Sequence, residues 1–214
     1  MVERELTNDS MIEEQVRARG VTDAAVLGAM RRVDRAVFVP EELRDEAYDD
    51  CALPVSLGQT ISQPYIVGFM TQLLGPCARG RVLDVGTGTG YQTAVLAQLA
   101  ETVFTLELLP ELAQTARARL ENLGYDNIRY AVGDGWHGWP QEAPFDGILT
   151  AAAAECVPET LCNQLAIGGR LVVPVGVEDQ ELIVIERVGP SEFHERKEGG
   201  VRFVPLVHGA SGDS

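Results

Sequence analysis

The sequence predicts an α/β fold: a mainly parallel sheet with helices on both faces, preceded by a helical extension. Three observations support this prediction. From Arg81 onward, short apolar runs alternate with helical patterns, as in βαβ units, whose crossovers cover both faces of a parallel sheet. A glycine-rich turn, VLDVGTGTG at residues 82–90, ends the first of these runs. The first eighty residues show helical periodicity instead.

Composition indicates a single globular domain. The chain has 214 residues, of which 45% are hydrophobic, enough for one core of ordinary size. We expect residues 1–80 to form the helical extension and a substrate loop, residues 81–207 the α/β core, and residues 208–214 a frayed tail. No apolar run approaches the ~20 residues that span a bilayer, and the start MVERELTNDS lacks the apolar segment of a secretory signal. These features predict a cytoplasmic protein, and we expect a monomer.

The extension contains three helical segments and a loop. Ser10 and Glu13 have the spacing of a capping box, which predicts a first helix from Ser10. Thr22 or Asp23 can cap a second helix over Ala24–Arg32. Residues 51–64, CALPVSLGQTISQP, have no helical period and predict the loop that joins the extension to the sheet. Proline is favoured at the first position of a helix, so Pro64 predicts a third helix through Leu74.

The core alternates strands and helices in chain order. Strands are expected at Arg81–Val85, Thr102–Glu107, Ile128–Val132, Phe145–Thr150 and Arg170–Pro174, and helices at Tyr91–Leu99, Pro110–Leu123 and Pro158–Leu165. Gly124 and the pair Gly168-Gly169 stand where helices commonly end. Two further strands, Glu181–Val188 and Val201–Val207, flank the turn-rich segment SEFHERKEGG and predict an antiparallel hairpin at the sheet edge.

The glycine run distinguishes between classes of nucleoside ligand. A dinucleotide fold favours G-x-G-x-x-G, but Tyr91 stands where that pattern needs its third glycine. No phosphate-binding lysine follows, so the sequence also argues against a nucleoside triphosphate as the ligand. Gly86, Gly88 and Gly90 instead resemble the first motif of the class I methyltransferases, which bind S-adenosylmethionine. The alternative is a tight strand-to-helix turn that needs its glycines for packing alone.

Acidic residues lie in or after three successive strands. Asp84 belongs to the first strand, Glu107 ends the second, and Gly133-Asp134-Gly135 follows the third. Ligands of open α/β sheets bind beyond the carboxyl ends of the strands, so one ligand would meet all three segments. Glu107 is expected to accept hydrogen bonds from a ribose diol, and Asp134 to meet the adenine amino group. Each acid taken singly could also be a solvated surface carboxylate.

Charge and cysteine content argue against some partners. A net charge of −15 argues against general binding to DNA or RNA, whose phosphates need a basic surface. The four cysteines show no C-x-x-C and no histidine at metal-ligand spacing, so no metal is expected. In a reducing cytosol we expect them to be small buried residues. The acidic composition, with Lys197 as the only lysine, fits either a high-salt cytoplasm or a codon bias.

The segment Gly58–Tyr65 carries hydroxyls and amides but no general base. Methyl transfer from a sulfonium mainly needs donor and acceptor held in line. A hydroxyl or amine acceptor usually needs a base, whereas a carboxylate is already ionised at neutral pH and needs only orientation. Ser62 could therefore orient a carboxylate, or it could cap the helix that follows. His137 is interpreted as an exposed loop residue, and Trp136 and Trp139 as packing residues.

GQTISQPY at residues 58–65 resembles the signature of the protein-L-isoaspartate O-methyltransferase family. The similarity continues, in the family's order, through VLDVGTGTGYQTAVLAQL, LELLPELAQTAR, GDGWHGWPQEAPFDGI, GGRLVVPVG and RFVPLV. It implies the Rossmann-like class I methyltransferase fold. It also implies methylation of the free α-carboxylate of L-isoaspartyl residues in damaged proteins and peptides, with S-adenosylhomocysteine as the second product. The ester then collapses to a succinimide, which hydrolyses partly to aspartate.

The resemblance also implies roles for individual residues. Ser62 matches the family's active-site serine, which orients the carboxylate, and Thr60, Ile61 and Val207 match positions that bind the substrate. The implied cofactor-binding residues are Asp84, Gly86, Thr87, Gly88, Gly90, Glu107, Asp134 and Gly135. One departure is the alanine run at 151–154, since many members have prolines after the fourth strand. This departure affects the expected shape of that loop rather than the chemistry.

Two other functions remain open on the sequence alone. The first is methylation of a small molecule or of RNA, against which the acidic balance and the lack of an NPPY-type motif weigh. The second is a sensor or scaffold that binds the cofactor without turnover. Ser62 beside a complete set of cofactor residues argues against this second possibility. The predicted partners are therefore isoaspartyl proteins and peptides, with no nucleic acid, membrane or metal.

Overall fold

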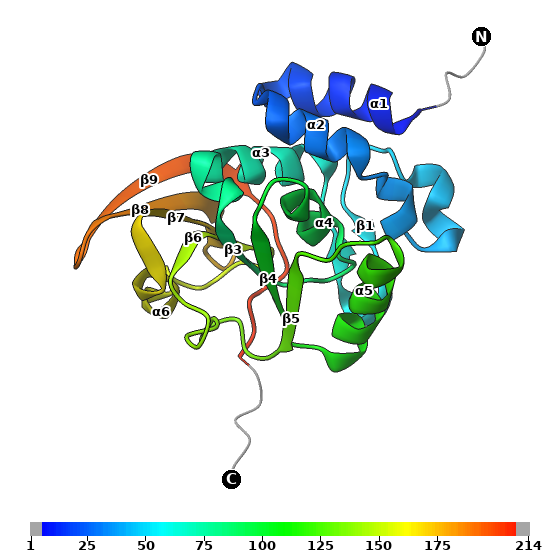
Figure 1. Cartoon of the computed structure of the whole chain (residues 1–214). Helices are drawn as coiled ribbons and strands as arrows, with labels where there is room; N and C mark the ends of the chain where they lie inside the picture. The colour runs from blue at the N-terminus through cyan, green and yellow to red at the C-terminus, as the bar shows by residue number, and fades with distance from the viewer. Residues whose placement is uncertain (1–5, 209–214) are drawn as a thin grey trace.

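A computed structural model describes residues 6–208 and has a seven-stranded sheet at its centre (Figure 1). The strand order is β5-β4-β3-β6-β7-β8-β9. The strands are β3 (Arg81–Val85), β4 (Thr102–Glu107), β5 (Ile128–Val132), β6 (Phe145–Thr150), β7 (Leu165–Val175), β8 (Gln180–Gly189) and β9 (Glu192–Val201). Strands β3 to β7 pair in parallel, whereas β8 and β9 are antiparallel. The predicted fold class is confirmed, and the predicted bounds of β3 to β6 are correct.

Helices lie before the sheet in the chain and between its strands. They are α1 (Asn8–Met11), α2 (Ala24–Arg32), α3 (Pro64–Leu74), α4 (Tyr91–Ala97), α5 (Pro110–Asn122) and α6 (Glu159–Asn163). After α1 the chain continues through a π turn at Ile12–Val16 and a 3₁₀ turn at Arg17–Arg19. Further 3₁₀ segments are Arg35–Phe38, Glu41–Glu46, Ser56–Gly58 and Gly75–Arg79. In Figure 1 the N-terminal helices stack above α3 and α4, away from α6.

The helix starts follow local capping chemistry. The capping box predicted at Ser10 and Glu13 is wrong by one turn, because Thr7 is the N-cap: its hydroxyl accepts from the Ser10 amide, and the Ser10 hydroxyl accepts from the Thr7 amide. Asp23 caps α2 by accepting from the amides of Ala25 and Val26. Of the two predicted caps, Asp23 and not Thr22 is therefore the N-cap of α2. Gly124 follows α5 with a φ of 84°, as expected of a residue that ends a helix.

Two apolar clusters cover opposite faces of the sheet. Consecutive strand residues point to opposite faces, and Val82 belongs to one cluster whereas Leu83 belongs to the other. The first cluster joins the sheet to the N-terminal helices, α3 and α4; the second joins it to α6. The carboxyl ends of β3, β4 and β5 lie side by side, since these parallel strands are neighbours in the observed order.

The C-terminal third differs from the sequence prediction. Gly168 and Gly169 do not end a helix, because α6 stops at Asn163 and both glycines lie in a bulge of β7, between its pairings with Phe145 and Gly147. A Cβ on Gly169 would lie 2.9 Å from two carbonyl oxygens, so only glycine fits there.

The predicted hairpin exists, but its second strand is wrong. Strand β9 is the segment expected to be the turn, and Val201–Val207 is mostly a loop beyond it. Strand β9 is an edge strand whose side chains are mostly exposed, so it needs no apolar alternation. Residues 202–208 run back from β9 across the middle of the molecule (Figure 1).

The expected burial of the cysteines is wrong for three of the four. Cys51 and Cys156 are exposed, Cys77 is half-buried, and Cys162 is buried. The first three lie outside helices and strands or in a short 3₁₀ turn, and such connecting segments run over the surface. Cys162 lies in α6, and burial raises the pKa of its thiol to about 11.

Candidate active site

A cavity opens at the carboxyl ends of β3 and β4, and it extends under the C-terminal segment. Its interior volume is about 150 Å³, and its mouth is open to solvent. Six segments of the chain line it: Gln59, Thr60, Ile61, Ser62 and Val67; Val85, Gly86, Thr87, Gly88, Thr89, Tyr91 and Gln92; Leu106, Glu107, Leu108 and Leu109; Gly133 and Gly135; Ala151 and Ala152; and Val204, Pro205, Leu206 and Val207.

The glycine turn between β3 and α4 forms one wall of this cavity. Gly86, Gly88 and Gly90 all have positive φ, at 95°, 53° and 91°, which side chains with a Cβ rarely adopt. A Cβ on Gly90 would meet Leu120 at 3.1 Å and one on Gly86 would meet Ala151 at 3.4 Å, whereas a Cβ on Gly88 would have only one backbone oxygen within 4 Å. Gly90 is therefore required for packing as well as for its φ, while Gly88 leaves open space for a ligand to approach the backbone.

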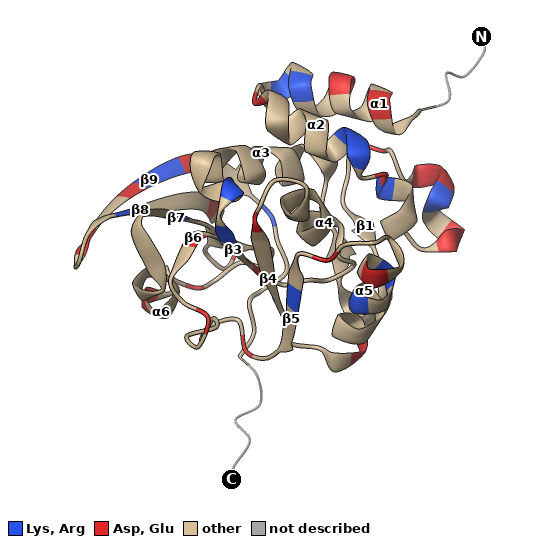
Figure 2. Cartoon of the chain, in the orientation of Figure 1, with Lys and Arg blue, Asp and Glu red and all other residues tan. Residues whose placement is uncertain are grey.

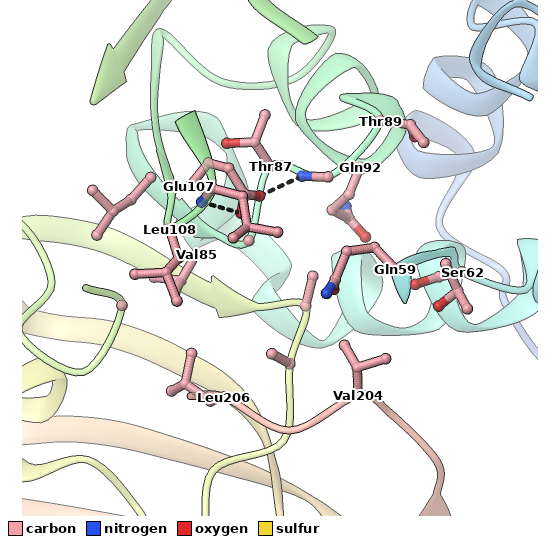
Figure 3. A pocket seen from close by; sticks show the side chains of 18 of the residues that line it. Gln59, Ser62, Val85, Thr87, Thr89, Gln92, Glu107, Leu108, Val204 and Leu206 are labelled. Atoms are coloured by element: carbon pink, nitrogen blue, oxygen red, sulfur yellow. Dashed lines mark hydrogen bonds between the residues drawn. The ribbon is translucent and has the colours of Figure 1, made fainter. Parts of the chain in front are cut away.

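Glu107 ends β4 and borders the cavity next to the glycine turn (Figure 3). It is only 7% exposed. One carboxylate oxygen accepts from the Gly88 amide at 2.8 Å and the other from the Leu109 amide at 3.1 Å. Both oxygens keep a lone pair for a further donor. The sequence did not indicate that Glu107 also braces the glycine turn.

Asp84 does not line the cavity. It is fully buried under the glycine turn and accepts from the hydroxyls of Thr93 at 2.6 Å and Thr105 at 3.4 Å. Thr105 contacts the hydroxyl of Thr87 at 2.6 Å, and Thr87 does line the cavity. Burial raises the pKa of Asp84 to about 7, against the opposing effect of the hydroxyl hydrogen bonds. Asp84 thus reaches the cavity only through Thr87, and its predicted contact with a cofactor remains a prediction.

Asp134 also lies outside the cavity lining, although its neighbours Gly133 and Gly135 belong to it. Its side chain accepts from the Trp136 amide at 2.8 Å and lies 3.5 Å from His208. Trp136 stacks on His208, with ring centres 4.8 Å apart, and its indole donates to the Leu206 carbonyl at 2.9 Å. Asp134 and Trp136 therefore hold the C-terminal segment, and the contact of Asp134 with adenine remains a prediction.

Residues 53–61 form a small hairpin instead of an irregular loop. Strands β1 (Leu53–Pro54) and β2 (Thr60–Ile61) pair antiparallel. Thr60 and Ile61, in β2, and Ser62, directly after it, line the cavity, and Figure 3 shows Ser62 opposite Glu107 and Leu108. The N-cap of α3 is Gln63, not Ser62, and no side chain makes a capping bond there. The alternative role of Ser62 as a helix cap is therefore wrong.

A second, longer groove meets the cavity at this hairpin. Thr60, Ser62 and Val204 line both. The groove is also lined by Tyr65, by the β7–β8 turn and by residues 200–203. Tyr65 is held by Arg19, whose guanidinium lies 3.9 Å from the ring centre. The two hollows thus give a ligand site and an open channel that share one short wall.

The alanine run after β6 packs against the C-terminal segment. Ala153 donates to the Val204 carbonyl at 2.8 Å and accepts from the Leu206 amide at 2.7 Å. This pairing carries residues 204–207 across the cavity, so Val207, which is 52% exposed, borders it, and its contact with substrate remains a prediction. Ala151 and Ala152 line the cavity beside Gly86. The alanines that replace the prolines of many family members therefore include residues of the cavity wall.

Gln92 is a site residue that the sequence analysis missed. It lies in α4, is 9% exposed and lines the cavity near Gln59 (Figure 3). Its amide nitrogen donates to the Thr71 hydroxyl at 2.9 Å, and that hydroxyl donates to the Val67 carbonyl. Because the Thr71 hydroxyl already donates its proton to the Val67 carbonyl, it can only accept from Gln92. The NH₂ of Gln92 therefore faces Thr71, and its amide oxygen remains available as an acceptor. No motif marks Gln92, since its role depends on α3 and α4 packing together.

The cavity residues fit S-adenosylmethionine. The space above Gly88 admits a ligand against the backbone, the Glu107 carboxylate can accept from a ribose diol, and Val85, Leu106, Leu108 and Leu206 supply apolar surface. The uncharged polar groups of the hairpin lie at the other end (Figure 3). Among residues 6–208, no group of His, Cys, Asp and Glu could hold a metal ion, and no helix is long and apolar enough to cross a membrane.

Comparisons with known proteins agree with this site. The family model for protein-L-isoaspartate(D-aspartate) O-methyltransferase matches residues 6–211. The chain is 50% identical over 211 residues to protein-L-isoaspartate O-methyltransferase 2 of Pelobacter propionicus, covering 98% of this chain and 93% of that protein. It is 52% identical over 200 residues to the protein of the same name from Marinobacter nauticus, covering 92% and 91%. A solved Plasmodium falciparum protein-L-isoaspartate O-methyltransferase in complex with S-adenosylhomocysteine has a TM-score of 0.83 at 26% identity, covering 95% of this chain and 99% of that one.

Proposed function

The chain belongs to the protein-L-isoaspartate(D-aspartate) O-methyltransferase family, and on that basis we propose that it methylates L-isoaspartyl residues. The methyl group passes from S-adenosylmethionine to the free α-carboxylate of such residues in damaged proteins and peptides. The resulting ester initiates repair through a succinimide. The observation that carries this proposal is that Ser62 and Thr60 line both the cavity and the open groove.

The cavity is the donor half of the proposed site. Bound S-adenosylmethionine supplies a sulfonium methyl group for in-line displacement. Glu107 accepts from the ribose hydroxyls, and its orientation is set by the amides of Gly88 and Leu109. Leu206 and Val207 cover the cavity from the C-terminal side and limit its access to water, which favours transfer over side reactions.

The groove is the acceptor half. A peptide lies in it with the isoaspartyl carboxylate at Ser62, whose hydroxyl donates a hydrogen bond to one carboxylate oxygen. The carboxylate is already ionised at neutral pH, so no residue has to remove a proton. As the carbon–oxygen bond forms, the carbon–sulfur bond breaks and the electron pair stays on sulfur. Ser62 therefore acts by orientation, which can account for a large share of a rate enhancement.

The experiment uses labelled S-adenosylmethionine and two peptides that differ only in an isoaspartyl or aspartyl linkage. Base-labile label is expected on the isoaspartyl peptide alone. Equal labelling of both peptides, or none, would refute the proposed specificity. Binding of S-adenosylhomocysteine without any transfer would favour a sensor or scaffold.

A cytoplasmic location, a monomeric state and the absence of nucleic-acid or membrane partners remain predictions. A net charge of −15 supports the lack of nucleic-acid binding. Figure 2 adds that arginine and lysine lie among acidic residues on the N-terminal helices, α5 and β9, with no continuous basic face in that view. Light scattering after gel filtration would measure the oligomeric state directly.

A further inference from the structure

Arg35 is a charged side chain in an unusual setting. It begins the 3₁₀ segment Arg35–Phe38 and is 0% exposed, and it is the one buried lysine or arginine among residues 6–208. No carboxylate of those residues lies within ion-pair distance of it. Burial lowers the pKa of Arg35, yet a guanidinium stays protonated in proteins. A full positive charge is therefore buried without an ion-pair partner in contact, although Asp49 lies near enough to stabilise it electrostatically.

The guanidinium donates only to main-chain carbonyls. One terminal nitrogen donates to the carbonyls of Cys51 at 3.0 Å and Ser62 at 3.1 Å, and the other donates to the Ala47 carbonyl. Cys51 precedes β1 and Ser62 directly follows β2. A single nitrogen atom thus joins the two ends of the hairpin that carries Thr60 and Ser62.

The strand pairing of this hairpin is weak, although Leu53 and Ile61 are buried in the first apolar cluster and the Gln63 side chain donates to Asp50 across its base. Its strands are two residues long, with two register pairs, and an isolated two-stranded hairpin is marginal in water. Its turn adds the bonds Val55 to Gln59 at 2.9 Å and Gln59 to Ser56 at 3.3 Å. At its tip Leu57 is exposed and has a φ of 59°, a conformation that costs energy in a residue with a Cβ. The position of Ser62 therefore depends on the burial of Ile61 and on the contacts at the base of the hairpin, among which Arg35 binds the Ser62 carbonyl itself.

Fold stability alone is a poor explanation for Arg35. A buried charge without an ion-pair partner in contact carries a large desolvation penalty, and apolar residues of similar volume are often as stable or more so. The Nε atom of Arg35 also has no hydrogen-bond partner, which adds to the penalty. An apolar side chain would avoid both penalties, but it could not bind two carbonyls of different segments at once.

We propose that Arg35 is a positioning residue for the methyl-acceptor site: by clamping Cys51 and Ser62 it holds the hairpin so that the Ser62 hydroxyl faces the cavity. This inference rests on the proposed function of Ser62. Arg35 itself does not line the cavity or the groove, so it acts on the substrate only through the hairpin.

The test compares wild-type protein with Arg35→Lys, which keeps the charge but cannot span the two carbonyls in the same way. We expect kcat/KM for the isoaspartyl peptide to fall by about tenfold to a hundredfold, since an ångström of misplacement can cost that much. Hydrogen exchange of amides in residues 53–63 should accelerate while that of β3 to β6 stays unchanged. The affinity for S-adenosylhomocysteine, measured by calorimetry, should change by less than about threefold.

Arg187→Lys is the matched control. Arg187 also donates to main-chain carbonyls, those of Asn163, Leu165, Gly189 and Pro190, but it lies on β8. This variant should lose thermal stability without a change in kcat/KM for the peptide.

Three results would overturn the positioning role of Arg35. One is wild-type kcat/KM in Arg35→Lys, and another is unchanged exchange in the hairpin. The third is that neither Arg35→Lys nor Arg35→Gln yields folded protein that binds S-adenosylhomocysteine, which would make Arg35 a residue of fold stability. A wild-type protein that labels no isoaspartyl peptide would instead refute the proposed function, while the exchange comparison would still report on the clamp.

Discussion

Replacing Glu107 with glutamine should weaken cofactor binding without unfolding the protein. The two carboxylate oxygens accept from the backbone amides of Gly88 and Leu109, at 2.8 and 3.1 Å, and we propose that both also accept from the ribose. A glutamine side chain has one acceptor oxygen and one NH₂ group. In either orientation the NH₂ therefore faces a backbone amide, and one ribose hydroxyl loses its charged acceptor.

The size of the effect follows from these contacts. A hydrogen bond to a charged group contributes about 1.5–3 kcal/mol, and every ~1.4 kcal/mol is tenfold in affinity. Loss of one such bond to the ribose thus raises the Kd by about tenfold to a hundredfold. The unpaired backbone amide adds a loss of stability of about 1–3 kcal/mol. This second effect acts on the free protein as well, so it should appear as a lower melting temperature.

Calorimetric titration with S-adenosylhomocysteine measures the Kd, and thermal unfolding without ligand measures stability. Glu101→Gln is the matched control, because Glu101 is exposed and lies just before the other end of β4. It removes the same charge beside the same strand and should leave the Kd unchanged. A Glu107→Gln protein that binds S-adenosylhomocysteine as tightly as the wild type would refute the role of Glu107 in ribose binding.

Three further variants test other parts of the site. Ser62→Ala should lower kcat/KM for an isoaspartyl peptide by about tenfold to a hundredfold, the value of one hydrogen bond to a carboxylate, and unchanged kinetics would contradict its orienting role. Gly88→Ala should lose about 1–2 kcal/mol of stability because its φ is 53°, and should bind S-adenosylhomocysteine more weakly because the methyl group enters the cavity; calorimetry and denaturant unfolding measure both. Asp84 binds a proton in the native state up to about pH 7, whereas its ordinary pKa is 3.8, so its contribution to the free energy of unfolding decreases as pH rises between these values. Asp84→Asn should remove this decrease in unfolding experiments between pH 4 and 8, and an unchanged slope would show that Asp84 does not titrate in that interval.

The core of the fold could be predicted because its signals are local. Strands β3 to β6 are short apolar runs between turns, and their bounds agree with the structure. Strand β9 was missed because an exposed edge strand carries charged residues on both sides of its chain. Gly168 and Gly169 were misassigned because a glycine pair occurs both at the ends of helices and in β-bulges. Which of the two it forms here depends on pairing with the neighbouring strand β6.

In the candidate site, too, residues with local sequence signals could be predicted, whereas those that depend on tertiary packing could not. Glu107 and the glycine turn could be predicted from the sequence. The turn directly follows one apolar strand, and Glu107 ends the next strand along the chain. Asp84 was assigned to the cofactor by its position in the motif; that contact remains a prediction, and the sequence did not indicate that its side chain binds Thr93 and Thr105 under the glycine turn. Gln92 carries no sequence signal, since its amide is oriented by Thr71 of a different helix.

The sequence by itself determined the class of fold, the cofactor motif and the family to which the chain belongs. These properties depend on periodicity and on short motifs, which can be read without knowing what lies across the core. Only the tertiary structure decided which segments enclose the ligand: the hairpin at residues 53–61, held by Arg35, and residues 204–207, held by Ala153 and Trp136. Those contacts join residues far apart in the chain, and they depend on the packing of the two apolar clusters, which holds the segments together.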